Sequence, residues 1–120
     1  MDLQKLRQSV EDEIRCYEYE DPADSIGTPW TTFRVKDTLV AMQAALVQPY
    51  WVEVELRDTL DQIVGEEIEL CSWAVVADDA NGYVLAFDPN KNEFLLAVKR
   101  GARFWSIGIR GNAVECFMAR

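Results

Sequence analysis

A dense run of carboxylates between residues 18 and 24 is the part of the sequence best suited to chemistry. The run follows an expected helix end, whose free carbonyls and negative dipole pole favour a cation. Calcium takes about six to eight oxygen ligands, and a loop can turn several oxygens toward one point. One acidic residue of the next expected helix could join from across the loop. The sequence therefore predicts a Ca²⁺ site formed by Glu18, Glu20, Asp21, Asp24 and Asp37. A solvated helix end is the competing interpretation.

Two further segments match the calcium-binding loop of EF-hands in part. In the segment 77–88, Ala77 occupies the first ligand position and Asp88 stands where a closing glutamate belongs. The segment 88–93 places Glu93 where a glycine is required. Asp and Asn favour turns, so we interpret both segments as turns between strands and find no complete EF-hand.

A pair of glutamates offers the one pattern suited to acid–base catalysis. Glu53 and Glu55 share one face of an expected strand, about 7 Å apart by strand geometry. That separation lies in the range that inverting glycosidases use. Any Glu-x-Glu on a strand has the same spacing, so a solvated face beside Arg57 is the simpler interpretation.

The sequence contains no histidine. This excludes Ser-His and Cys-His nucleophiles and histidine-ligated zinc. It also lacks Cys-x-x-Cys and the glycine-rich loops that bind nucleotide phosphates. The three cysteines Cys16, Cys71 and Cys116 are odd in number and lie among apolar residues, so we expect reduced core cysteines. We expect a protein without catalytic activity.

The net charge is −9 and is unevenly distributed. Residues 1–79 hold 18 acidic and 6 basic residues, whereas residues 80–120 hold 3 acidic and 6 basic residues. Such a field repels phosphate backbones, which argues against nucleic-acid binding, and attracts cations or basic proteins. An acidic interaction domain, or an immunity-type inhibitor of a basic protein, is the alternative function. Trp30 and Trp51 would suit a protein-binding patch if they were exposed.

Two amphipathic helices are expected in the first half of the chain. Apolar residues recur at three- and four-residue steps over 2–20, at Leu3, Leu6, Val10, Ile14 and Tyr17. A second helix begins at Thr31 or Thr32 and runs to about Gln48, where Pro49 ends it. Its buried stripe comprises Val35, Leu39, Met42 and Leu46.

The second half changes to a period of two, typical of strands. Strands are expected at 50–57, 67–77, 83–88, 93–100 and 104–110, with short helices at 60–64 and from the cap Asn112. The sequence thus predicts a single α+β domain over 1–120, with two N-terminal helices packed on a five-stranded antiparallel meander. A curled sheet with both helices across one face is favoured over a small barrel with the helices added at its N-terminus.

The chain resembles the small acidic calcium-binding protein of heterocyst-forming cyanobacteria. The resemblance rests on length, acidity, the lack of histidine, the run Glu18-Tyr19-Glu20-Asp21, and Asp37 without an EF-hand. It implies a calcium buffer or sensor of calcium signalling that uses surface carboxylates. No signal peptide and no apolar run of membrane-spanning length is apparent, so we expect a cytoplasmic monomer with no membrane partner.

Overall fold

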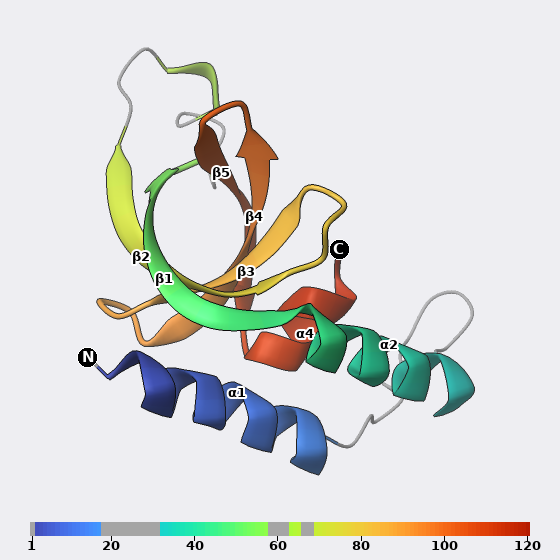
Figure 1. Ribbon diagram of the computed structural model, residues 1–120. Coiled ribbons are helices and arrows are strands. Elements are labelled where there is room, and N and C mark those ends of the chain that lie inside the picture. Colours follow the sequence, from blue (N-terminus) through green and yellow to red (C-terminus); the bar gives the residue numbers. More distant parts are fainter. Residues whose placement is uncertain (1, 18–31, 58–62, 66–68) are drawn as a thin grey trace.

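The computed structural model describes residues 2–17, 32–57, 63–65 and 69–120. Its helices are α1 (Leu3–Cys16), α2 (Thr32–Ala45) and α4 (Ala113–Met118). Its strands are β1 (Leu46–Glu55), β2 (Leu70–Asp78), β3 (Tyr83–Asp88), β4 (Glu93–Arg100) and β5 (Arg103–Gly111). The helices gather at one end of the sheet (Figure 1), so the predicted α+β class is confirmed. Within the described ranges, no helix is long and apolar enough to cross a membrane.

Helix α1 begins at Asp2, whose carboxylate accepts the backbone N–H of Gln4 at 2.9 Å. This side chain satisfies one of the amides that a helix start leaves without a partner. The expected stripe is confirmed, because Leu6, Val10 and Ile14 are buried. The helix ends at Cys16, and residues 18–20 of the expected helix lie outside the described ranges.

Helix α2 passes directly into β1. The helix ends at Ala45 and the strand begins at Leu46, so the predicted helix end near Gln48 is wrong. A residue before proline favours extended backbone, which lets the strand form upstream of Pro49. The proline lies where the register of β1 with β2 shifts, and an interrupted ladder tolerates its missing N–H.

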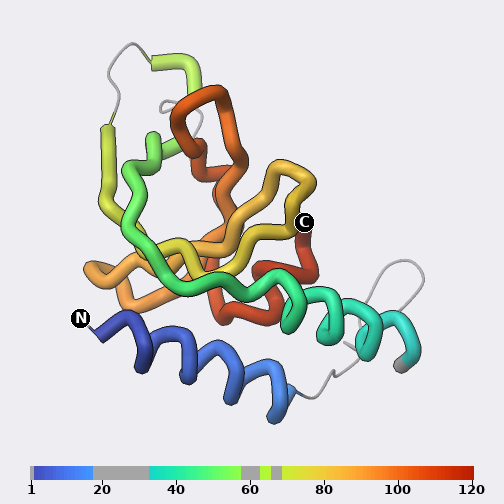
Figure 2. The backbone as a smooth tube through the Cα atoms, viewed as in Figure 1, coloured from blue at the N-terminus to red at the C-terminus, as the bar shows by residue number. Residues whose placement is uncertain are grey.

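The five strands form one closed sheet in the order β1-β2-β3-β4-β5, hereafter the ring. Sequential neighbours pair antiparallel, and β1 returns to β5 through two parallel pairs, Val54 with Phe104 and Glu55 with Trp105. The sheet closes on itself, as in the expected small barrel. Helices cover its outer wall, as in the expected curled sheet. Figure 2 shows the curvature that this closure requires.

Strand β5 bends at Gly108, whose φ is +80°. The register of β4 with β5 shifts at this point, between Leu95 and Ala97. A glycine adopts this left-handed backbone without the steric cost of a Cβ. Such bulges increase strand twist, which helps a short sheet to close.

Two apolar layers stabilise the ring. One fills its interior, with Val54, Trp73, Val75, Val84, Ala86, Leu95 and Ala97. The other lies between the outer wall and the helices, with Leu6, Val10, Met42, Leu85, Phe87, Val114 and Phe117 among its members. The expectation that the second strand is apolar on both faces is confirmed, because Trp73 to Ala77 are all buried.

The predicted meander agrees closely with the structure. Strands 83–88 and 93–100 have the expected bounds, and 104–110 is one residue longer at each end. The 67–77 strand begins at Leu70 and ends at Asp78, with residues 66–68 outside the described ranges. The Asn112 side chain caps α4 by accepting the N–H of Glu115 at 2.9 Å. Of the expected 60–64 helix, residues 63 and 64 are helical and 60–62 are outside the described ranges.

Candidate functional site

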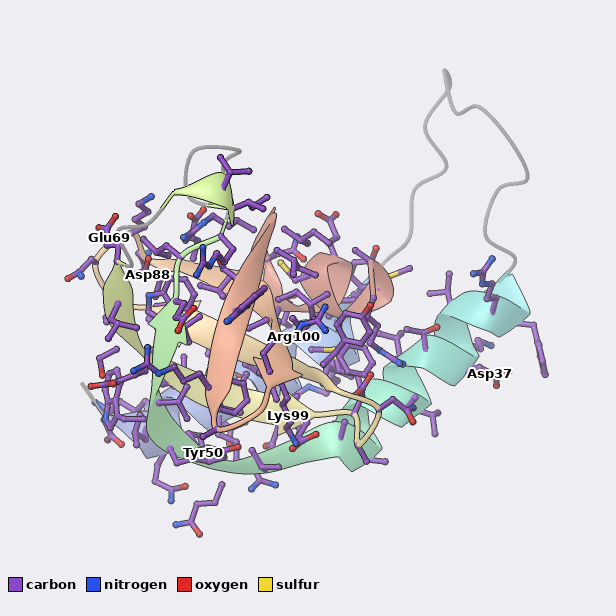
Figure 3. All side chains as sticks on the ribbon, turned by 90° about the horizontal axis from the view of Figure 1, so that it is seen from above. Asp37, Tyr50, Glu69, Asp88, Lys99 and Arg100 are labelled. Carbon is purple, nitrogen blue, oxygen red and sulfur yellow. The ribbon has the colours of Figure 1, made fainter. Side chains whose placement is uncertain are left out.

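The predicted calcium ligands fall mostly outside the described part of the chain. This holds for Glu18, Glu20, Asp21 and Asp24. Asp37 lies exposed on α2, and its carboxylate makes no hydrogen bond or ion pair with a described residue. Figure 3 shows Asp37 well away from the labelled acidic residues Glu69, which precedes β2, and Asp88 of β3. Among the described residues, no three metal-ligating side chains form a group that could hold a metal ion.

The acidic residues of the hairpins stabilise turns. Asp78, Asp79 and Asp88 each accept the backbone N–H two residues ahead, at 2.9, 2.7 and 2.9 Å respectively. Their second oxygens pair with Lys99, Arg120 and Arg110. The interpretation of both segments as turns between strands is therefore confirmed, with the turns themselves at 79–82 and 89–92.

Glu55 differs from the expected solvated position, because only 5% of it is exposed. Its carboxylate lies between Arg103 at 2.8 Å and Arg57 at 3.1 Å. Hydrogen bonds from Arg103 and then from Arg57 lower the pKa of Glu55 below its ordinary value. A general acid needs a raised pKa, and its companion Glu53 is exposed. The geometry thus argues against acid–base catalysis by this pair.

Arg57 and Arg100 lie over the ring of Trp105. Their guanidinium carbons are 4.8 and 5.6 Å from the ring centroid, the range of cation–π contacts. Arg57 also donates its backbone N–H to Ser106 Oγ at 2.7 Å. Two residue pairs join β1 to β5, and this contact is hereafter called the seam. Ion pairs, a cation–π stack and a hydrogen bond surround it.

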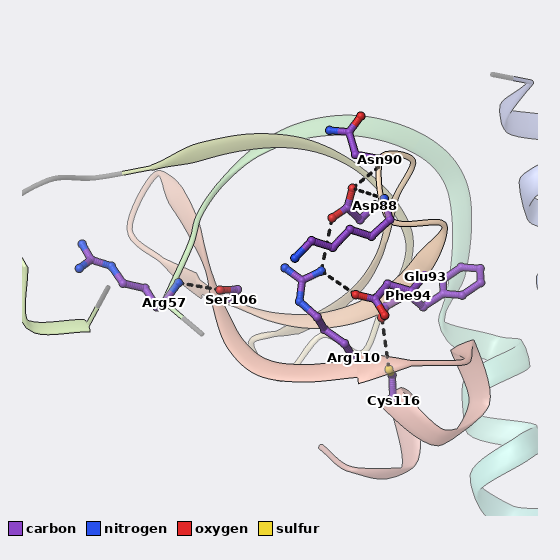
Figure 4. A network of polar contacts seen from close by, with 9 residues as sticks. Arg57, Asp88, Asn90, Glu93, Phe94, Ser106, Arg110 and Cys116 are labelled. Atoms are coloured by element: carbon purple, nitrogen blue, oxygen red, sulfur yellow. Dashed lines mark hydrogen bonds and ion pairs between the residues drawn. The ribbon is translucent and has the colours of Figure 1, made fainter. Parts of the chain in front are cut away.

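A second charged cluster lies where β3, β4 and β5 meet. Arg110 reaches from β5 to Asp88 at 3.3 Å and to Glu93 at 3.2 Å (Figure 4). Its guanidinium also lies over Trp73, 5.1 Å from the ring centroid. Asp88 is only 4% exposed. No local pattern indicates this cluster, because Arg110 lies 22 residues from Asp88 and 17 residues from Glu93 in the chain.

Two exposed aromatic side chains lie on β1, and another, Phe33, lies on α2. Tyr50 is 40% and Trp51 is 45% exposed, next to the exposed Glu53. Trp30 lies outside the described ranges, and Trp73 is buried inside the ring. Trp51 is thus exposed, as a protein-binding patch on this strand requires.

A hollow of about 370 Å³ separates α2 from the turn between β2 and β3. Its apolar lining includes Ala41 and Ala44 of α2 and Phe117 of α4. At its edge Arg120 pairs with Asp79 at 3.2 Å and lies 4.0 Å from the centroid of Phe117. The polar groups at this edge therefore satisfy one another.

The cysteines occupy three different environments. Cys116 is buried, and desolvation raises its pKa to about 11, so the thiol stays protonated and unreactive. Burial also raises the pKa of the partly exposed Cys71. Cys16 is exposed, so the expectation of a core cysteine is wrong there. It lies in the last turn of α1, away from the face that Leu6, Val10 and Ile14 bury.

Most of the net negative charge comes from acidic residues outside the described ranges. The described residues hold all 12 Lys and Arg and 13 of the 21 Asp and Glu. The other eight carboxylates fall in 18–31, 58–62 and 66–68, which contain no basic residue. The described residues thus carry a net charge of −1, from 12 basic and 13 acidic residues, and the other eight carboxylates account for the rest of the net charge of −9.

No protein-family model, curated protein or solved structure matches the chain.

Proposed function

We propose that this protein binds calcium without catalysing a reaction, as a cytoplasmic buffer or sensor. The ligands would be Glu18, Glu20, Asp21, Asp24 and Asp37. The observation that supports this proposal is the clustering of charge in the sequence: residues 18–24 hold four carboxylates and no basic residue. Like charges close together in sequence raise the energy of the unliganded chain, and a divalent cation relieves that repulsion.

Most carboxylates among the described residues already have partners. Nine of the 13 described acidic side chains accept hydrogen bonds from backbone or from basic and amide side chains. Each of these nine carboxylates therefore has at least one oxygen engaged within the described part of the chain. The four others are Asp37, Glu53, Glu69 and Glu115. Of these, Asp37 belongs to the predicted ligand set.

Calcium titration by calorimetry at physiological ionic strength tests the proposal. We expect saturable binding by the wild-type protein and about tenfold weaker binding by Asp21→Asn, because a central charged ligand is lost. Glu115→Gln is the matched control, since it removes one exposed carboxylate without a described partner. Equal weakening in both variants would mean diffuse charge attraction, and no binding at millimolar calcium would exclude the site.

A second candidate function is favoured by the exposed Trp51, which shares one face of β1 with the exposed Glu53. Aromatic residues with adjacent acidic groups suit an interface with a basic protein, whose association opposite charges accelerate. With chelator present, a pull-down should retain a basic partner on the wild-type protein and lose it on Trp51→Ser. Val64→Ser is the control, because Val64 is 70% exposed elsewhere. Equal retention by all three proteins would exclude this patch.

A further inference from the structure

One edge of β1 pairs with no described strand over most of its length. Along its first edge β1 pairs with β2. Along its second edge only Val54 and Glu55 pair, with the start of β5. Upstream of Val54, no described residue pairs with this second edge. Because Pro49 has no N–H, the stretch from Tyr50 to Glu53 is the part that offers both donors and acceptors, and it is hereafter called the open edge.

The exposure of the open edge differs from that of a strand paired on both sides. In β3, which β2 and β4 flank, every residue from Val84 to Asp88 is buried. In β1, Tyr50 and Trp51 point to opposite faces and are 40% and 45% exposed. Glu53 is exposed as well. Both faces of β1 are therefore accessible along the open edge.

A hollow of about 350 Å³ lies beside the open edge. Val52 and Glu53 of β1 form one side of it, and Ala102, Arg103 and Phe104 form the other. These last three residues belong to the turn between β4 and β5 and to the start of β5. Because β5 begins only here and runs parallel to β1, it pairs with β1 only beyond the hollow. The hollow therefore gives a further chain segment access to the backbone of β1.

We propose that the open edge binds an extended segment of a basic partner protein as an added strand. Backbone N–H and C=O groups of β1 would bond to those of the segment, as sheet edges do when they bind peptides. Trp51 and Glu53 share one face of β1, so they favour an apolar and a basic residue two positions apart in the segment. The net charge of −9 favours a basic partner and opposes a second copy of the chain. The proposal rests on the second candidate function and adds the means of binding.

Amide hydrogen exchange of the free protein tests whether the edge is open. Alternate amides of residues 50–53 point away from β2 and should exchange quickly, whereas their neighbours bonded to β2 should be protected. Strand β3 is the matched control, because β2 and β4 flank it and both sets of its amides should be protected. Uniform protection of 50–53, or protection that grows with protein concentration as a second copy would cause, would overturn the proposal.

A short synthetic peptide supplies the partner chemistry in the binding test, with chelator present. Valine and lysine alternate at its odd positions, and threonine fills its even positions. At millimolar concentration the peptide should slow the exchange of the fast amides of 50–53 at least tenfold. Peptides N-methylated at the odd or at the even positions separate backbone bonding from charge attraction, because only one of these sets of N–H groups faces β1. One methylated peptide should lose binding; equal binding by both, or no protection by the unmethylated peptide, would overturn the proposal.

Glu53→Lys tests the charge contact, and Glu115→Lys is its matched control. Both changes replace one exposed carboxylate by a cation, but Glu115 lies on α4 rather than on β1. The peptide should bind Glu53→Lys at least tenfold more weakly than the wild-type protein and should bind Glu115→Lys nearly as well. Equal weakening would show general charge attraction and contradict the proposal.

The pull-down with Trp51→Ser measures the second candidate function separately. A basic partner that Trp51→Ser loses, and that protects the fast amides of 50–53 in the wild-type protein, would support the added strand. A partner that Trp51→Ser loses, but that leaves those amides unprotected, would keep the interface and exclude the added strand.

Discussion

Replacing Arg110 by methionine should lower the free energy of unfolding by about 3–5 kcal/mol, because it leaves a buried carboxylate without its cation. Asp88 is 4% exposed, and Arg110 is 3.3 Å from its Oδ2. Glu93, which Arg110 contacts at 3.2 Å, loses the same partner. Methionine keeps an alkyl chain beside Trp73, so the change removes mainly the charge.

Chemical denaturation of the wild-type protein, the two single variants and the double variant separates the contribution of the ion pair to stability from that of packing. Asp88→Asn should keep an oxygen for the turn around Asn90 while losing the charge. The double variant Arg110→Met/Asp88→Asn should be less destabilised than the sum of the single variants, since it leaves no buried charge of this pair alone. Additive effects would show that the two side chains act independently.

Arg7→Met is the matched control for this series. Arg7 pairs with Glu11 at 3.2 Å on the surface of α1, where both side chains are about one-third exposed. An exposed pair of this kind contributes about 0.2–0.5 kcal/mol. An equally large loss of stability in Arg7→Met would therefore contradict the assignment of the effect to burial.

Local patterns in the sequence predicted the elements well. The strands at 83–88 and 93–100 follow from alternating apolar residues bounded by turn residues, and Asn112 caps α4 as its type predicts. The end of α2 was predicted from Pro49 alone, and the ladder with β2 extends the strand through that proline. Tertiary pairing here outweighs the local signal.

Long-range contacts explain what the sequence did not predict. Glu55 belongs to an alternating strand and was expected in solvent, yet Arg103, far away in the chain, covers it. Closure of the ring depends on the same contact between β1 and β5, which no local pattern encodes. Arg57, two residues from Glu55 on the same strand face, was the one local signal of an ion pair.

For the predicted calcium ligands, the sequence gives more information than the structure does. Composition located the acidic excess in the first part of the chain, and the structure shows that the described frame itself is nearly neutral. The four carboxylates from Glu18 to Asp24 lie outside the described ranges, so their role stays a proposal. Asp37 is described, and its exposed carboxylate, which makes no ion pair with a described residue, is compatible with that role.

The seam between β1 and β5 should open when Glu55 loses its charge. Only two residue pairs join these strands, whereas six join β3 to β4. Glu55 supplies both oxygens of the seam's ion pairs, to Arg103 and Arg57. The isosteric change Glu55→Gln should therefore lower the melting temperature at neutral pH by several degrees. It should also accelerate amide hydrogen exchange at the seam more than between β3 and β4.

The lowered pKa of Glu55 determines how its contribution to stability changes with pH. The pKa of Glu55 lies below its ordinary value of 4.5 in the folded protein, so the folded state favours the ionised form. Its contribution to stability is complete above pH 4.5 and is lost as the pH falls through the lowered pKa. The difference in melting temperature between the wild-type protein and Glu55→Gln should thus be constant near neutral pH and shrink in acid. The other carboxylates titrate in both proteins, so their effect cancels in the difference between the two melting temperatures.

Glu53→Gln provides the control on the same strand, because Glu53 is exposed and makes no ion pair with a described residue. Its melting temperature should follow that of the wild-type protein at every pH. If Glu55→Gln behaved like Glu53→Gln, the ion pairs would contribute nothing to closure. The apolar contacts inside the ring, around Val54 and Phe104, would then hold the seam by themselves.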